Sequence, residues 1–104
     1  MAHSLILSTA CSKDEALQIS RALVERRLAA CVNLVGPIES IYRWKGEVES
    51  AQEVLMLIKT ESARFEEVRD AIKQLHSYEV PEVVEVSVEN GSADYLKWMS
   101  ESVR

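Results

Sequence analysis

The sequence predicts an α+β fold in which the main elements follow the order β-α-β-β-α-β, with one added C-terminal helix. Two observations carry this prediction. Short apolar or alternating stretches of strand type are separated by stretches with helical period. A Lys45-Gly46 reversal joins two strand-like stretches into a long hairpin. Right-handed crossovers then give a four-stranded antiparallel sheet with both main helices on one face.

The first half of the chain begins with Leu5–Ala10, a short apolar run suited to an interior strand. Ser12 and Glu15 match a capping box, in which the Ser12 hydroxyl accepts from the backbone N–H of Glu15 and the Glu15 carboxylate reaches back to that of Ser12. A second β-rich run covers Ala30–Val35. The helix between them carries one apolar stripe made of two rows. The rows are Ala16, Ile19 and Leu23, and Leu17, Val24 and Leu28.

The stretch from Ile38 to Thr60 predicts a hairpin with arms of about ten residues, roughly 33 Å each at strand rise. Pro37 cannot donate to a ladder, so it should lie at a bulge or on an edge strand. Ser50–Gln52 marks a second expected irregularity. Because a domain of about 100 residues has a radius of gyration near 13 Å, the hairpin should protrude and carry Tyr42 and Trp44 towards its tip. Exposed aromatic side chains there invite a partner surface, so we expect an oligomer with these two residues at its contacts.

From about Ser62 the apolar period becomes helical, and Tyr78-Glu-Val-Pro81 ends that helix because the residue before a proline avoids the α region. Its apolar positions are Phe65, Val68, Ile72 and Leu75. Val84–Val88 alternates as a last strand, and Ser92 is the expected N-cap of a final helix. The apolar side of that helix holds Tyr95, Leu96, Met99 and Val103, with Trp98 beside it.

This order is that of the ferredoxin-like split βαβ fold. Such a fold leaves the second face of the sheet bare, although the strand residues expected there include Leu, Val and aromatic side chains. One small C-terminal helix cannot cover that face. We therefore expect sheet-to-sheet packing between subunits.

Length and composition predict one domain, residues 1–104, in a soluble globular protein with 47% apolar and 28% charged residues. The net charge of −5 argues against non-specific binding to nucleic acid or an anionic membrane. No apolar run approaches the ~20 residues of a membrane span, and the N-terminus lacks a basic signal-peptide region, so the expected location is the cytoplasm. Cys11 and Cys31 form no CxxC pair and read as reduced thiols.

Five separated blocks of the chain match one known family at the same spacings. They are Ala29-Ala-Cys-Val-Asn33, Ser40-Ile-Tyr-x-Trp-x-Gly46, Glu53-x-x-x-x-Ile-Lys-Thr60, His76-x-Tyr78-x-x-Pro-Glu82 and Gly91-x-x-x-Tyr-Leu-x-Trp98. Together they resemble the CutA divalent-cation tolerance proteins. The resemblance implies a ferredoxin-like fold, a homotrimer whose hairpins extend neighbouring sheets, a likeness to PII signalling proteins, and a role in tolerance of copper and other divalent ions.

The chain departs from that family's pattern at three positions. Ser8 stands where some relatives carry a cysteine, Leu75 where some carry a second histidine, and Ser77 where a proline is usual. Copper favours thiolate and imidazole ligands, so these departures weaken the expectation of tight copper binding. Copper or another divalent cation remains the expected ligand, with His76 as the candidate metal ligand. The alternative is a histidine that interacts with a helix dipole and bonds to free carbonyl groups.

The remaining candidates are expected at a cleft between subunits, where a small anion, a metabolite or a partner protein would bind. They are Glu53, Lys59, Tyr78, Glu82, Tyr95 and Trp98. Packing of the aromatic residues onto a sheet, and ion pairs between subunits for Glu53 and Lys59, are the alternative explanations. The sequence contains no Gly-rich phosphate loop, no HExxH and no nucleophile motif, so it does not predict an enzyme.

Overall fold

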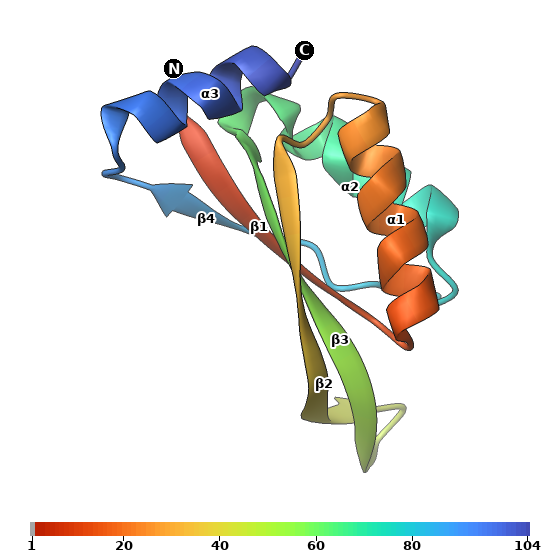
Figure 1. The fold of residues 1–104 in the computed structure, drawn as a ribbon. Helices are drawn as coiled ribbons and strands as arrows, with labels where there is room; N and C mark the ends of the chain where they lie inside the picture. Colours follow the sequence, from red (N-terminus) through yellow and green to blue (C-terminus); the bar gives the residue numbers. More distant parts are fainter. Residues whose placement is uncertain (1) are drawn as a thin grey trace.

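The four strands form one antiparallel sheet in the order β2-β3-β1-β4, with three α-helices (Figure 1). The computed structural model describes residues 2–104; Met1, the first residue of the predicted domain, lies outside the described residues. The elements are β1 (His3–Ala10), α1 (Lys13–Glu25), β2 (Cys31–Trp44), β3 (Glu47–Glu61), a 3₁₀ turn (Ser62–Arg64), α2 (Phe65–Leu75), β4 (Val84–Val88) and α3 (Ala93–Ser102). The predicted α+β fold with the split βαβ order is confirmed.

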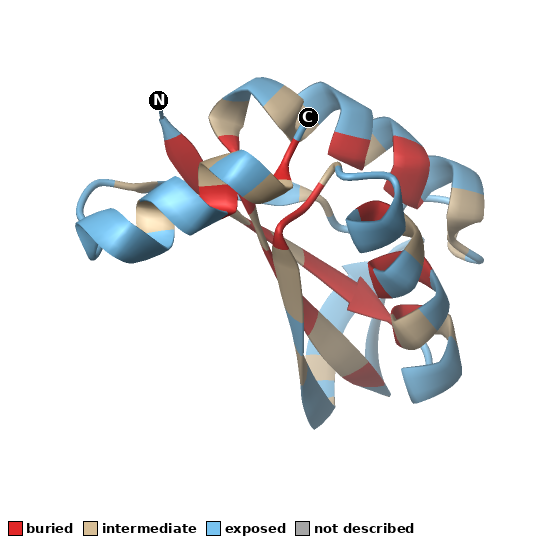
Figure 2. Cartoon of the chain, turned by 45° about the horizontal axis from the view of Figure 1, so that its top comes forward, coloured by how far each residue is buried: buried red, intermediate tan, exposed pale blue. Residues whose placement is uncertain are grey.

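The core lies between the sheet and the layer formed by α1 and α2, which lie on the same face (Figure 1). Alternation along β1 and β3 points every second side chain at the helices. The largest apolar side chains of this core, all fully buried, are Ile6, Ile19, Leu23, Met56, Ile58, Val68 and Ile72. Figure 2 shows buried segments, coloured red, where the helices meet the strands. The other strand positions face away from the helices.

The start of α1 confirms half of the predicted capping box. The Ser12 hydroxyl accepts from the backbone N–H of Glu15 at 3.1 Å. The Glu15 carboxylate, however, accepts from the backbone N–H groups of Cys11 and Ser77 instead of that of Ser12, because the chain after α2 passes beside the helix start. Val24 was expected in the apolar stripe but is 41% exposed, since it lies at the edge of that stripe near the helix end.

No helix among residues 2–104 is long and apolar enough to cross a membrane.

Strand β2 pairs with β3 from Cys31 opposite Lys59 to Trp44 opposite Glu47. The register shifts between Val35 and Ile38, which confirms a bulge at Pro37 on an edge strand. The second irregularity, expected at Ser50–Gln52, is wrong. The ladder continues through it without a shift, because short polar side chains fit an exposed two-stranded ribbon and Ser50 donates to the Glu39 carboxylate at 2.7 Å.

The hairpin protrudes from the body, as its length predicted (Figure 1). The whole chain measures 44 × 25 × 22 Å along its principal axes. At the tip, Gly46 has φ of +84°, a backbone conformation that side-chain-bearing residues rarely adopt. Tyr42 and Trp44, near this tip, are 41% and 38% exposed.

The sheet face that points away from α1 and α2 is covered only at one end. There Met99 of α3 and Val103, the residue after the helix, pack against Ala30. Beyond α3 this bare face carries apolar side chains that are half-buried or exposed. They are Leu5, Leu7, Val35, Leu55, Leu57, Val84 and Val86. The expectation that one C-terminal helix cannot cover this face is confirmed.

Candidate functional site

The segment after α2 brings Tyr78 onto Glu53 of β3. The Tyr78 hydroxyl donates to Glu53 Oε2 at 2.7 Å, and Glu53 is only 8% exposed. Burial, and after it the hydrogen bond to the carboxylate, raise the pKa of Tyr78 well above its ordinary value of 10.0. The phenol is therefore a protonated donor at neutral pH, and it offers the Glu53 side chain a neutral partner.

The side chain of His76, the candidate metal ligand, is fully buried and uses both ring nitrogens within the chain. Nε2 lies 2.6 Å from the carbonyl oxygen of Thr9, and Nδ1 lies 3.0 Å from the backbone nitrogen of Tyr78. A carbonyl only accepts and a backbone N–H only donates, so the imidazole is the neutral form with its proton on Nε2. A metal ion at Nδ1 would have to displace the Tyr78 N–H. In this chain His76 anchors the segment that carries Tyr78.

The Glu15 carboxylate holds the other side of the same segment. Oε2 accepts from the Ser77 N–H at 2.9 Å and Oε1 from the Cys11 N–H at 3.3 Å. Burial alone raises the pKa of Glu15, but these bonds and one from the Ser77 hydroxyl outweigh it, so the pKa lies below its ordinary value of 4.5. The Cys11 thiol is exposed and lies 3.8 Å from the Ser77 hydroxyl. Sequence reasoning missed this network because no short motif marks contacts between residues more than sixty positions apart.

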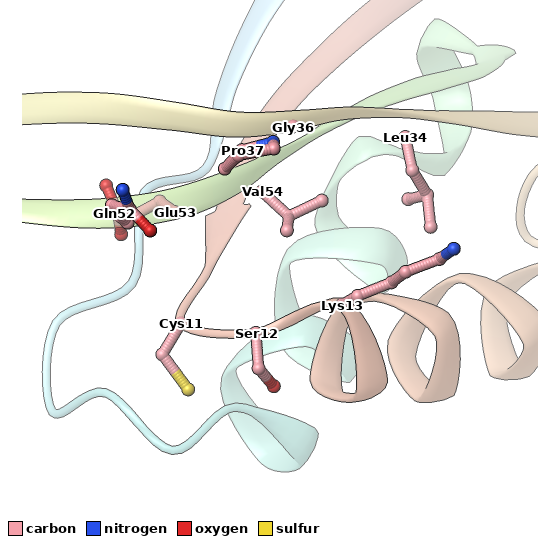
Figure 3. Close-up of a pocket in the computed structure, with 9 residues that line it drawn as sticks. All are labelled: Cys11, Ser12, Lys13, Leu34, Gly36, Pro37, Gln52, Glu53 and Val54. Atoms are coloured by element: carbon pink, nitrogen blue, oxygen red, sulfur yellow. The ribbon is translucent and has the colours of Figure 1, made fainter.

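Glu53 lies between two cavities. The smaller, about 360 Å³, separates the β2 bulge from the start of α1. Figure 3 shows Pro37 and Val54 on its strand side and Cys11, Ser12 and Lys13 on its helix side. The larger, about 780 Å³, lies between the hairpin and the segment after α2, and we call it the hairpin cavity. Its lining residues are Thr9, Ser40, Ile41, Tyr42, Trp44, Glu49, Glu53, Ser77, Tyr78, Glu79, Val80 and Glu82.

The six predicted cleft residues divide into two groups. Glu53, Tyr78 and Glu82 line the hairpin cavity. Near the other end of the sheet, Lys59 lies under α3 with its Nζ 5.8 Å from the centre of the Tyr95 ring, and the Tyr95 and Trp98 rings are 5.4 Å apart. Six residue steps along the strand separate Glu53 from Lys59, which is roughly 20 Å. One chain does not bring the two groups together.

Residues 2–104 of a single chain contain no convergent metal site. Among residues 2–104 no three His, Cys, Asp or Glu side chains lie close enough together to hold an ion. By the family resemblance, some relatives carry a cysteine at the position of Ser8 and a second histidine at the position of Leu75. The Ser8 hydroxyl is buried without a hydrogen-bond partner among the described residues, and Leu75 packs against the core. Cys31 is half-buried on β2, away from Cys11 at the start of α1.

Comparison with known proteins gives one consistent result. The family described as CutA1 divalent ion tolerance protein matches residues 4–102. The divalent-cation tolerance protein CutA of Thermus thermophilus is 46% identical over 100 residues, which cover 96% of this chain and 97% of that protein. The solved structure of CutA1 from Oryza sativa superimposes with a TM-score of 0.97 at 33% identity, covering 100% of this chain and 95% of that one. The solved structure of the periplasmic divalent cation tolerance protein CutA from Archaeoglobus fulgidus superimposes with a TM-score of 0.95 at 43% identity, covering 98% of this chain and 99% of that one.

Proposed function

Because this chain belongs to the CutA1 divalent ion tolerance family, we propose that it acts in divalent-cation tolerance as a homotrimer whose cation site is assembled between subunits. One observation carries the proposal. Among residues 2–104 of one chain no three metal-ligating side chains converge, although Glu53 and Glu82 line one cavity, so only a second copy can bring further ligands to these carboxylates.

The bare sheet face supports the assembly. It exposes Val84, Val86 and Val35 at 47%, 49% and 44%, next to the half-buried leucines of β1 and β3. The protruding hairpin carries acidic and aromatic residues at one end of this face, and Lys59 lies near the other end. Two different patches that meet between copies make a heterologous contact, and such contacts close into a ring when the rotation permits. Three copies give the trimer that the resemblance implies.

Carboxylates are the ligands that the chain offers most readily. Glu53 and Glu82 line the same cavity, and oxygen ligands suit hard divalent ions. Copper would draw on imidazole, so His76 is the candidate nitrogen ligand, at the cost of its Nδ1 bond to the Tyr78 N–H. The family description names tolerance to divalent ions and no chemical reaction, and we do not propose catalysis.

Calorimetric titration of the purified protein with Cu²⁺, Zn²⁺ and Mn²⁺ tests the cation site. Wild type should bind with saturation, Glu82→Gln should bind more weakly, and Glu66→Gln, an exposed position on α2, should match wild type. Reduced Cu²⁺ binding in His76→Ala, with the fold retained by circular dichroism, would assign the imidazole as a ligand. Wild-type binding no stronger than that of free carboxylates would contradict the metal function.

A second function is favoured by the hairpin cavity. A trimeric sensor or scaffold of PII type would bind a small metabolite or a partner protein at the subunit clefts, and a volume of about 780 Å³ is within the range of small-molecule sites. A metabolite that raises the melting temperature of wild type, and raises it less in Tyr78→Phe, would support this function. A screen without any shift would count against it.

A further inference from the structure

We infer that the buried carboxylate of Glu53 receives its counter-charge from Lys59 of a neighbouring copy, so that each contact between subunits holds one such ion pair. The inference rests on the homotrimer proposed above and names the two side chains that set its register. It leaves Glu82, which lines the same cavity as Glu53, as the carboxylate whose cation binding is tested above.

The bare sheet face carries a carboxylate and an ammonium group on β3, with two leucines between them. Alternation along the strand gives this face, in order, Glu53, Leu55, Leu57 and Lys59. Lys59 is half-buried, and its ammonium lies 5.8 Å from the centre of the Tyr95 ring. Among residues 2–104 no carboxylate pairs with Lys59, and no cationic side chain pairs with Glu53.

Covering this face with a neighbouring copy removes both charges from water. Glu53 is already only 8% exposed in one chain, and its Oε2 accepts one bond from the neutral Tyr78 hydroxyl. A charge that is buried without a partner is costly, and an opposite charge at close range offsets that cost. Because Glu53 and Lys59 of one chain stand roughly 20 Å apart, they cannot pair with each other. A contact that covers the leucines is therefore favoured when it brings the carboxylate of one copy to the ammonium of the next.

Exposed aromatic rings accompany both charges. Between copies these rings would close around the ion pair and exclude water, which strengthens the attraction between opposite charges. A head-to-tail contact of this kind repeats at each step of the rotation, so a closed ring contains the same pair at every contact. The rings are Tyr42 and Trp44, which line the cavity beside Glu53, and Tyr95 and Trp98, which lie on α3 beside Lys59.

Dilution at a fixed urea concentration, followed by light scattering, measures the protein concentration at which the trimer dissociates. Glu53→Gln and Lys59→Met keep the approximate sizes of the side chains. Each should raise this concentration at least about tenfold, because each leaves the opposite charge buried without a partner. The double variant should assemble better than either single variant, since it leaves no unpaired charge at the contact. Glu66→Gln combined with Lys73→Met, both exposed on α2, is the matched control and should dissociate as wild type does.

Mixing two charge-reversed chains tests whether the pair joins different copies. Glu53→Lys alone and Lys59→Glu alone each put like charges at every contact of the ring, so neither should form trimers. When the two chains are refolded together, a ring of three holds opposite charges at two of its contacts, and trimers should reappear. Circular dichroism on each chain records that its helices and strands are retained.

The outcomes separate this pair from the trimer itself. Trimers that reappear only in the mixture would support the inference. Losses in Glu53→Gln and Lys59→Met that simply add in the double variant, or a mixture of folded chains without trimers, would overturn it while the wild-type trimer stands. A wild type that remains a single folded chain would remove the proposed trimer and this ion pair together.

Discussion

Single polar side chains decide how the segment after α2 is held. Glu15, on α1, accepts from the backbone of Ser77, and His76 bonds back to Thr9 at the end of β1. Tyr78 then reaches Glu53 on β3. These bonds join three elements at the edge of the hairpin cavity. Because the groups are buried or half-buried, the loss of one partner leaves another polar group without its bond.

Glu15→Gln should make the protein less stable at neutral pH and less sensitive to acid. The pKa of Glu15 in the folded protein lies below 4.5. Its contribution to the free energy of unfolding is therefore fully present above pH 4.5 and is lost as the pH falls through the folded pKa. A glutamine can accept from only one of the two N–H groups at a time with full strength, and we expect a loss of about 1–2 kcal/mol at pH 7. Urea denaturation at pH 7 and below pH 4.5 measures the difference. The exposed Glu89→Gln is the control, and an equal loss in Glu15→Gln at both pH values would contradict the assignment.

At the scale of elements, the bulge in β2 decides what the hairpin presents. Val35 pairs with Leu55 and Ile38 with Glu53, so two residues of β2 stand opposite one residue of β3. The extra residue exchanges the faces to which the later side chains of β2 point. Tyr42 therefore shares a face with Glu49 and, along the strand, with the bare side of the sheet. Without the extra residue the aromatic side chains would lie on the opposite face of the ribbon, away from the hairpin cavity.

Replacing both Tyr42 and Trp44 by alanine should weaken the proposed trimer. The two rings keep 41% and 38% of their surface exposed in one chain, and burying such area between subunits stabilises an assembly. Light scattering on dilute protein should show a smaller mass than for wild type, with the strands retained by circular dichroism. Arg43→Ala, on the other face of the same strand, is the control. A double variant with the wild-type mass would refute the role of the hairpin.

At the scale of the whole molecule, the chain has one covered and one uncovered sheet face. The helices bury the first, and α3 protects only the end of the second near Ala30. Apolar surface left in water forgoes about 25 cal/mol for each Å² that could be buried. The other described elements leave the rest of this face uncovered. In the proposed trimer, copies of the same chain would cover it, and the two separated groups of cleft residues would meet at the contacts.

The stability of the protein should accordingly depend on its concentration. If folding and assembly are coupled, the melting temperature rises with protein concentration by mass action. Differential scanning calorimetry across a hundredfold range of concentration, with light scattering at each, measures this coupling. A well-folded single chain at micromolar concentration with an unchanged melting temperature would exclude it.

The sequence by itself determined the order and type of the elements. Apolar alternation in Val84–Val88, the helical spacing of Phe65 to Leu75, the Ser12 cap and the bulge at Pro37 all follow from local chemistry, because each depends on residues near one another in the chain. The bare face was predictable for another reason: the number and order of the predicted elements limit how much of the sheet the helices can cover.

Only the tertiary structure decided which distant residues meet. It joined Glu53 to Tyr78, put Lys59 with Tyr95 at the other end of the sheet, and occupied both nitrogens of His76. It also gave the Glu15 carboxylate to Ser77 instead of to its own helix cap. Such pairings depend on how the crossover segments lie against the sheet. Each contact joins residues of elements that are distant in the sequence, so no local pattern predicts it.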